Sequence, residues 1–175
     1  MGNNNIQIDI DETIIEFVKS HCTDKIDIKK KIEEILEAVL KEQNINANMV
    51  DVSIQSATEE EIKEINKKYR GVDKATDVLS FPIFTREEIK QMGSGGNLQL
   101  NTEIELGDII LCLNIIEKQS KEYATGLIRE ILYMITHGMC HLVGHDHEIE
   151  EEKVVMRALE EKVLKKVGVG NPHEK

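Results

Sequence analysis

Four of the six histidines in this chain of 175 residues lie within one stretch of eleven: His137, His141, His145 and His147. Apolar side chains recur at helical spacing before this stretch, so we expect a buried helix from about residue 120 onward. On such a helix His137 and His141 stand one turn apart on the same face, which suits two ligands of one metal ion. Gly144 can adopt the left-handed conformation that ends a helix, so the chain can turn back and bring His147 to the same ion.

Three neutral imidazoles leave the fourth position of a tetrahedral zinc ion open, as in catalytic rather than structural zinc sites. The ion would lower the pKa of a bound water to about 7 and polarise a phosphoryl or carbonyl oxygen. Because no carboxylate ligand offsets the charge of the ion, an anionic substrate such as a phosphodiester is favoured. We therefore predict one Zn2+ per chain at His137, His141 and His147, and another divalent transition metal would also suit these donors.

Three residues beside these ligands need a separate interpretation. His145 is expected to be a solvent-exposed loop residue, although it lies close enough to His147 in the sequence to compete with it as a ligand. Asp146 could accept the N–H of an imidazole and orient that ring, but a turn-forming role or the N-cap of the last helix explains it equally well. Cys140 points to another face of the helix than His141 and is expected to pack in the core.

The pattern His-Gly-x-x-His-Leu-x-Gly-x-Asp-His over residues 137–147 resembles the signature of the YbeY family, bacterial rRNA maturation factors and metal-dependent endoribonucleases. Residues 69–82, with Tyr-Arg-Gly and then Thr-Asp-Val-Leu-Ser-Phe-Pro, and residues 106–109, Leu-Gly-Asp-Ile, also resemble that family. The resemblance covers most of the chain. Its two departures inside the signature are Cys140 and His145, and neither removes a ligand.

This resemblance implies a single-strand-specific endoribonuclease that acts in maturation of the small-subunit rRNA 3′ end and in ribosome quality control. Its partners would be RNA and the ribosome or ribosome-assembly proteins. The family's functional arginine falls on Arg70, which becomes the candidate catalytic residue, although its position alone would suggest an ordinary cation at a helix C-terminus. A guanidinium can bind the scissile phosphate through two N–H groups. Asp77 and Ser80 also match the pattern and are expected to be structural or to line the cleft.

Two alternative functions are compatible with the histidine spacing. The metzincin peptidases share it, but they need Glu directly after the first His as general base, and Gly138 stands there. Glu130 or Glu148 could replace that base, yet they are more simply a helix-surface residue and a helix-dipole residue. The other alternative is a non-enzymatic ribosome-assembly factor in which zinc only holds the last two helices together. The net charge of −11 favours it mildly, because a partner protein would then make the RNA contacts.

Composition limits the class of protein further. A net charge of −11 argues against broad non-specific nucleic-acid binding, and neither DNA nor a membrane is an expected partner. No apolar run reaches membrane-spanning length, and no signal peptide is recognisable at the N-terminus. Three cysteines without Cys-x-x-Cys spacing are typical of free thiols in a reducing cytoplasm. Bases gather at Lys63, Lys67, Lys68, Arg70 and Lys74, which is as typical of a solvated helix face as of a binding patch.

The expected architecture is one α+β domain over residues 1–175. Strands are predicted at residues 6–10, 49–56, 76–81 and 107–113, and helices at 28–42, 58–70, about 120–143 and 148–167. Residues 85–105 are expected to form a flexible loop and residues 168–175 a loose tail. Together these elements predict a small mixed four-stranded sheet packed with about four to five helices. The resemblance to the YbeY family implies that the metal helix lies against this sheet, in a zincin-like arrangement.

Overall fold

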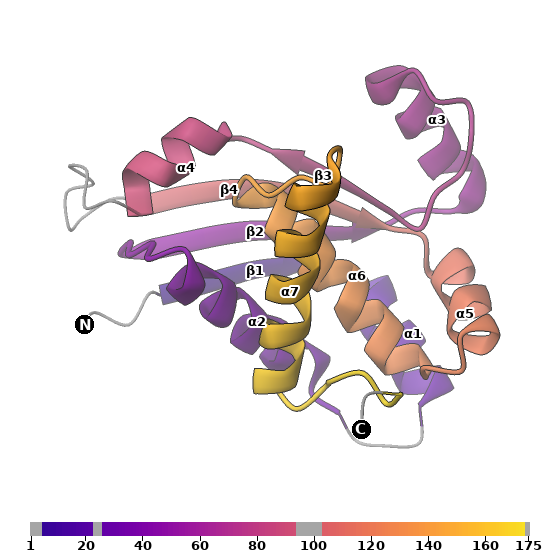
Figure 1. The fold of residues 1–175 in the computed structure, drawn as a ribbon. Helices are drawn as coiled ribbons and strands as arrows, with labels where there is room; N and C mark the ends of the chain where they lie inside the picture. Colours follow the sequence, from indigo (N-terminus) through magenta and orange to yellow (C-terminus); the bar gives the residue numbers. More distant parts are fainter. Residues whose placement is uncertain (1–4, 23–25, 94–102, 174–175) are drawn as a thin grey trace.

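The architecture is built on a four-stranded sheet (Figure 1). It is described by a computed structural model covering residues 5–22, 26–93 and 103–173. The strands are β1 (Asn5–Ile10), β2 (Met49–Ser56), β3 (Val78–Pro82) and β4 (Glu103–Leu111), in the order β1-β2-β4-β3. β1, β2 and β4 run parallel, and β3 pairs antiparallel with β4. The predicted mixed sheet is therefore confirmed.

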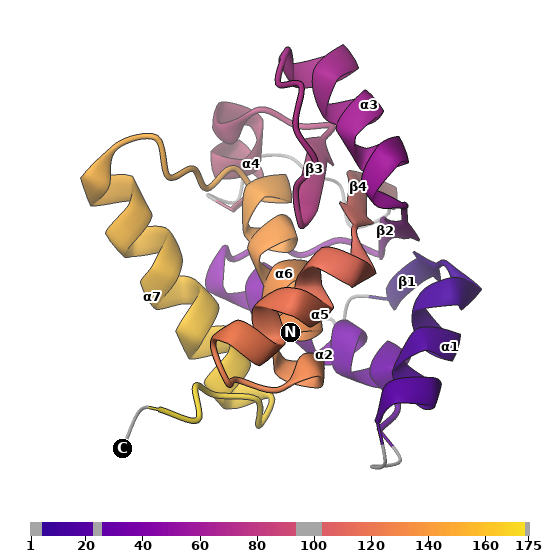
Figure 2. The same cartoon turned by 90° about the vertical axis from the view of Figure 1, so that its right-hand side faces the viewer.

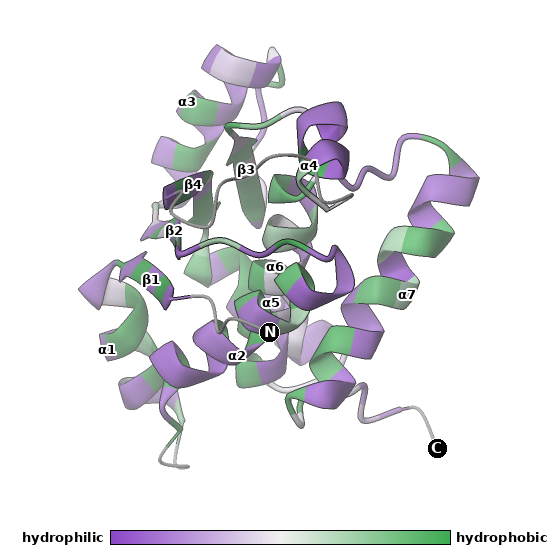
Figure 3. Cartoon of the chain, turned by 90° about the vertical axis from the view of Figure 1, so that its left-hand side faces the viewer, coloured by the Kyte–Doolittle hydropathy of each residue, from purple (hydrophilic) through white to green (hydrophobic). Residues whose placement is uncertain are grey.

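Helix α6 (Leu127–Leu142) is the central element of the helical layer. It contacts β3 and β4, and it also contacts α2 (Ile28–Glu42), α5 (Leu113–Glu122) and α7 (Glu150–Lys166). Figure 2 shows α6 between the strands and α7, which is the outermost helix on that side. The apolar colouring of α6 and the banded colouring of α7 in Figure 3 match these positions, because α6 is enclosed and α7 buries one side only.

Several predicted helix boundaries are confirmed. The N-cap of α2 is Asp27, whose side chain accepts a hydrogen bond from the backbone N–H of Lys30. Helix α3 (Glu59–Arg70) begins with a capping box between Thr58 and Glu61 and ends at Gly71 in the left-handed conformation.

The described residues contain seven helices rather than the four to five predicted. Helix α1 (Glu12–His21) was missed, although Asp11 caps it through the backbone N–H of Thr13. The predicted start of the metal helix near residue 120 is also wrong. The chain breaks there into α5 and α6, because Ala124 and Gly126 both adopt positive φ, +53° and +89°.

The loop predicted over residues 85–105 is wrong at both ends. Residues Arg86–Gly93 form helix α4, and β4 already begins at Glu103. Thr85 and Glu88 form a reciprocal capping box that starts α4: the Glu88 carboxylate accepts from Thr85 N–H at 2.7 Å, and Thr85 Oγ1 accepts from Glu88 N–H at 3.3 Å. The glycine-rich centre of the predicted loop lies outside the described residues.

The tail is attached to the helical layer as far as Gly170. The backbone N–H of Val169 donates to the carbonyl of Leu164 at 2.8 Å, and Arg129 Nε donates to the carbonyl of Gly170 at 3.4 Å. The prediction of a loose tail from residue 168 is therefore wrong for these residues.

Two further expectations concern cysteine packing and membrane insertion. Cys140 is fully buried in the main core, as predicted, and Cys112 is buried in a smaller cluster. In the ranges that the structure describes, no helix has the length and apolar character needed to cross a membrane.

Candidate metal centre

His137, His141 and His147 lie together, as predicted from their spacing. Each offers one ring nitrogen, and these three atoms all lie within 4.8 Å of one another. His137 and His141 are half-buried on α6, whereas His147 is exposed on the segment after it. The arrangement therefore combines two candidate ligands on a helix with a third candidate on the solvent side.

The turn after α6 brings His147 back to the helix. Gly144 adopts a φ of +87°, and its N–H donates to the carbonyl of His141 at 3.0 Å. The next N–H, of His145, donates to the carbonyl of Cys140, also at 3.0 Å. These two bonds satisfy carbonyls that the helix end leaves open, and the predicted role of Gly144 is confirmed.

Hydrogen bonds determine which nitrogen of each helix histidine carries a proton. His137 Nδ1 lies 2.7 Å from Oε1 of Glu160, and His141 Nδ1 lies 2.9 Å from the carbonyl oxygen of His145. A carbonyl and a carboxylate can only accept, so both rings donate through Nδ1. In the neutral rings, each Nε2 then presents its lone pair toward the other, across 3.2 Å.

A cation fits between these two nitrogens. Two ligands about 2.0–2.1 Å from a tetrahedral zinc ion lie about 3.3–3.4 Å apart, close to the separation of the two Nε2 atoms. Burial, reinforced by the neighbouring His137 and His147, lowers the pKa of His141 to about 4. His141 is therefore neutral at pH 7, as a metal ligand must be. The donor set and its protonation both suit a divalent transition metal.

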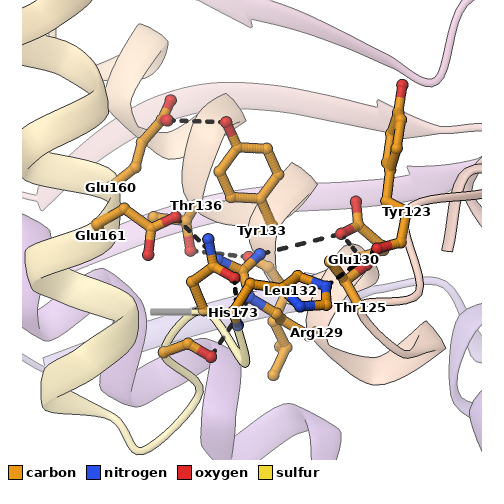
Figure 4. Close-up of polar contacts among 12 residues, drawn as sticks. Tyr123, Thr125, Arg129, Glu130, Leu132, Tyr133, Thr136, Glu160, Glu161 and His173 are labelled. Atoms are coloured by element: carbon orange, nitrogen blue, oxygen red, sulfur yellow. Dashed lines mark hydrogen bonds and ion pairs between the residues drawn. The ribbon is translucent and has the colours of Figure 1, made fainter. Parts of the chain in front are cut away.

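Glu160 is a site residue that the sequence analysis missed. It is only 2% exposed, and it accepts a hydrogen bond from the hydroxyl of Tyr133 at 3.1 Å (Figure 4) in addition to that from His137. The available signal was its position on the apolar side of α7, one turn after Met156. Asp146 bonds elsewhere: its Oδ1 accepts from the backbone N–H of His147 at 2.7 Å. The N-cap of α7 is Ile149, so the capping alternative for Asp146 is wrong.

His145 differs from its prediction as an exposed residue. It is half-buried, and its Nε2 is buried without a hydrogen-bond partner among the described residues. Burial lowers its pKa. Its ring is not one of the three that come together, and it contributes its carbonyl to His141 instead.

Polar contacts between α6 and α7 hold Glu160 beside His137. Arg129 Nη2 donates to Glu161 at 2.8 Å, as Figure 4 shows. Glu130 accepts from Thr125 Oγ1 at 2.5 Å and is only 4% exposed, so its interpretation as a helix-surface residue is wrong. Because these contacts engage Glu130, it cannot serve as the replacement base of a peptidase.

Gly138 allows α6 to pack closely on the sheet. A Cβ atom at this position would lie 2.9 Å from Cδ1 of Ile109 and 3.0 Å from two further atoms of that side chain. Gly138 stands at the position of the general base in metzincins, and here this position packs against Ile109 of β4, which leaves no room for a Glu side chain.

A cleft of about 540 Å³ joins two of the three histidines to Arg70. His141, His147 and Arg70 all line it. Arg70 lies at the end of α3, and its Nη2 donates to the carbonyl of Ser80 at 3.1 Å. Ser80 lines the cleft as well, so the expectation for it is confirmed.

Other residues singled out in the sequence lie outside this cleft. Asp77 has a structural role, because it accepts from the backbone N–H of Val78 and from the side chain of Gln119. Two lysines of the predicted basic cluster, Lys63 and Lys67, instead pair with Asp73 at 3.6 and 2.9 Å.

The cleft lining also contains a second arginine, Arg86, which the sequence analysis missed.

Comparisons with known proteins agree with the resemblance seen in the sequence. A family model described as Endoribonuclease YbeY matches residues 14–168. A curated relative of that name from Clostridium botulinum (strain Langeland) is 42% identical over 149 residues, which cover 79% of this chain and 87% of the relative. One from Thermoanaerobacter sp. (strain X514) is 38% identical over 149 residues, with 84% and 92% covered. The solution structure of TM1509 from Thermotoga maritima is similar with a TM-score of 0.50 and 25% identity, covering 97% of this chain and 99% of that one.

Proposed function

Because the chain belongs to the YbeY family of endoribonucleases, we propose that it is a metal-dependent endoribonuclease specific for single-stranded RNA. The observation that carries this proposal is the pair of Nε2 atoms facing each other across 3.2 Å, in a site whose His141 lines the same cleft as Arg70. Its substrate would be rRNA, at the 3′ end of the small-subunit rRNA, with a further part in ribosome quality control. The ribosome or its assembly proteins would be partners, in the cytoplasm.

His137, His141 and His147 would hold one zinc ion per chain. When bound, the ion supplies a Lewis acid and a water of lowered pKa. Glu160 and the carbonyl of His145 keep the two helix rings in the tautomer that leaves each Nε2 free to bind. His147 is exposed, so one side of the site stays open to substrate.

Arg70 would bind the phosphate that is cleaved. A guanidinium has five N–H donors, and the bond to Ser80 engages one of its two terminal nitrogens. That bond orients the group, while the remaining donors are available to two phosphate oxygens. Charge that develops on the phosphate during cleavage would be stabilised by the same contact.

The two alternatives are less well supported by the geometry. A peptidase lacks its base at Gly138, and of the two replacement bases considered, Glu130 is buried and bonded to Thr125, so only Glu148 lines the cleft. A purely structural zinc site is closed by four protein ligands, whereas three histidines gather here within the described residues and one of them is exposed.

The proposal is tested with the Arg70→Glu variant. We expect this variant to retain its zinc, because Arg70 contacts none of the three histidines through the bonds described here, and to lose cleavage of a labelled single-stranded RNA. Lys68→Gln, a loss of positive charge two residues earlier on α3, is the matched control and should keep its activity. Cleavage of casein with none of RNA by the wild-type protein would overturn the proposal in favour of a peptidase.

A further inference from the structure

Arg86 and Arg70 belong to different helices, α4 and α3, but both line the same cleft. Arg86 is the first residue of α4, and the cleft lining also contains His141 and His147. In the part of the chain that the structure describes, this lining holds two guanidinium groups and no lysine. The same lining holds the carboxylates of Asp146, Glu148 and Glu152, so Arg70 and Arg86 are the fixed cations through which a polyanion could bind at this site.

The position of Arg86 is unfavourable for the helix that carries it. The N-terminus of a helix has a partial positive charge, so acidic side chains such as Glu87 and Glu88 belong in the first turn and a cation does not. The capping box of Thr85 and Glu88 already starts the helix. Helix stability therefore does not explain an arginine here.

The backbone of Arg86 is held against the turn of the metal centre. A Cβ atom at Gly144 would lie 3.0 Å from Cα of Arg86 and 3.3 Å from its Cβ and Cγ. Gly144 is the residue that turns the chain between His141 and His147. The stem of Arg86 is thus packed beside the segment that carries the third ligand, so the guanidinium is kept in the cleft.

The guanidinium of Arg86 is paired with a carboxylate that resembles a phosphate in its geometry. Its Nη1 forms an ion pair with Oε1 of Glu152 on α7, and this carboxylate raises the pKa of Arg86. A carboxylate and a phosphate each present two oxygens to a guanidinium, and arginine forms bidentate, charge-assisted hydrogen bonds with either group. The two side chains are 48% and 26% exposed, and ion pairs in contact with solvent contribute little to stability. A phosphate can therefore displace Glu152 at small cost.

We propose that Arg86 is a second phosphate-binding residue of the cleft, and that Glu152 occupies its guanidinium until an RNA phosphate replaces the carboxylate. This inference rests on the proposed function, because it takes RNA as the ligand. Arg70 and Arg86 then hold the backbone of the strand from α3 and from α4. The competing structural explanation is that the ion pair only attaches the first turn of α7 to α4.

The two explanations predict different effects of substituting Arg86 and Glu152 on the affinity for RNA. Wild type, Arg86→Gln, Glu152→Gln and the double variant are compared in the metal-free form, which is expected not to cleave, by fluorescence anisotropy with a labelled single-stranded RNA over a series of salt concentrations. Arg86→Gln should weaken binding about tenfold and reduce the salt dependence by about 0.7 in the log–log slope, the loss of one phosphate contact on a single strand. Glu152→Gln should tighten binding, and the double variant should bind like Arg86→Gln.

Glu151→Gln is the matched control, because it removes the same charge from the neighbouring exposed position without lining the cleft. Its effect should be smaller than that of Glu152→Gln. Equal weakening by Arg86→Gln and Glu152→Gln, or equal effects of Glu151→Gln and Glu152→Gln, would overturn the inference. Cleavage by the zinc-loaded protein is measured separately. If the RNA is cut but Arg86→Gln and Glu152→Gln do not change its affinity in opposite directions, the nuclease proposal holds and the role of Arg86 is wrong. If the affinity changes in opposite directions but no RNA is cut, the role of Arg86 is supported and the nuclease proposal is wrong.

Discussion

The ring of His137 on α6 and the carboxylate of Glu160 on α7 are joined by a hydrogen bond of 2.7 Å between Nδ1 and Oε1. The bond links a metal-ligand candidate to a buried acid on the next helix, and that acid is itself bonded to Tyr133. Acceptors of this kind determine the tautomer of a ligating histidine and raise its basicity. The packing of α7 on α6 therefore contributes to the candidate metal centre.

Glu160→Gln should lower the affinity for zinc about 10- to 100-fold, because the amide does not supply the negative charge that increases the basicity of His137. The measurement is competition with a chelator at fixed pH. Tyr133→Phe, which keeps the carboxylate and its bond to His137, is the matched variant and should change the affinity much less. An unchanged affinity in Glu160→Gln, with the fold intact by circular dichroism, contradicts a role for this carboxylate in metal binding.

Gly138→Ala should lower the free energy of unfolding by about 1 kcal/mol. The new Cβ would come within 3.0 Å of three atoms of Ile109, and such overpacking costs about 1–3 kcal/mol, which exceeds the gain of about 1 kcal/mol in helix propensity. Denaturant unfolding of the metal-free protein measures the difference. In the Ile109→Val background the loss should shrink. A stabilised Gly138→Ala variant would mean that α6 does not pack this closely on β4.

Asp11 provides a pH-dependent contribution to stability. Its carboxylate accepts from the Ser56 hydroxyl at 2.5 Å and from the backbone N–H of Thr13 at 2.9 Å, and these bonds lower its pKa to about 2. The depressed pKa means that this stabilisation is complete above about 3.8, the ordinary value, and is lost as pH falls toward 2.

Asp11→Ala should therefore destabilise the protein by about 1 kcal/mol near neutral pH, as the loss of an N-cap does. The gap between wild type and variant in urea unfolding should narrow as the pH is lowered from about 3.8 toward 2. A gap that stays constant over this range would show that the charge of Asp11 does not contribute.

The gathering of the three candidate ligands could be predicted because they are close in sequence. His137 and His141 are one helical turn apart, and a glycine three residues later is enough to bring His147 back. Hydrophobic periodicity likewise predicted the bounds of α2 and α3 to within one residue. Local patterns of this kind depend on backbone geometry alone.

Contacts between distant segments could not be predicted in the same way. Glu160 reaches His137 from another helix, and Arg86 meets Glu152 across 66 positions of the sequence. Pairing of this kind depends on how α4, α6 and α7 pack, which periodicity does not determine. The exposure of His145 was also predicted wrongly: the residue is half-buried, and the nearby charge of Arg86, which helps to lower its pKa, comes from a distant segment of the sequence.

The most direct test of a metal-dependent nuclease is a zinc titration of metal-free protein, with cleavage of a labelled single-stranded RNA followed at each step. We predict that activity is absent without metal and reaches a plateau at about one equivalent of zinc, and that His141→Ala neither binds this equivalent nor cleaves. Full cleavage by the stripped protein, or an inactive protein that carries one equivalent of zinc, would contradict the account.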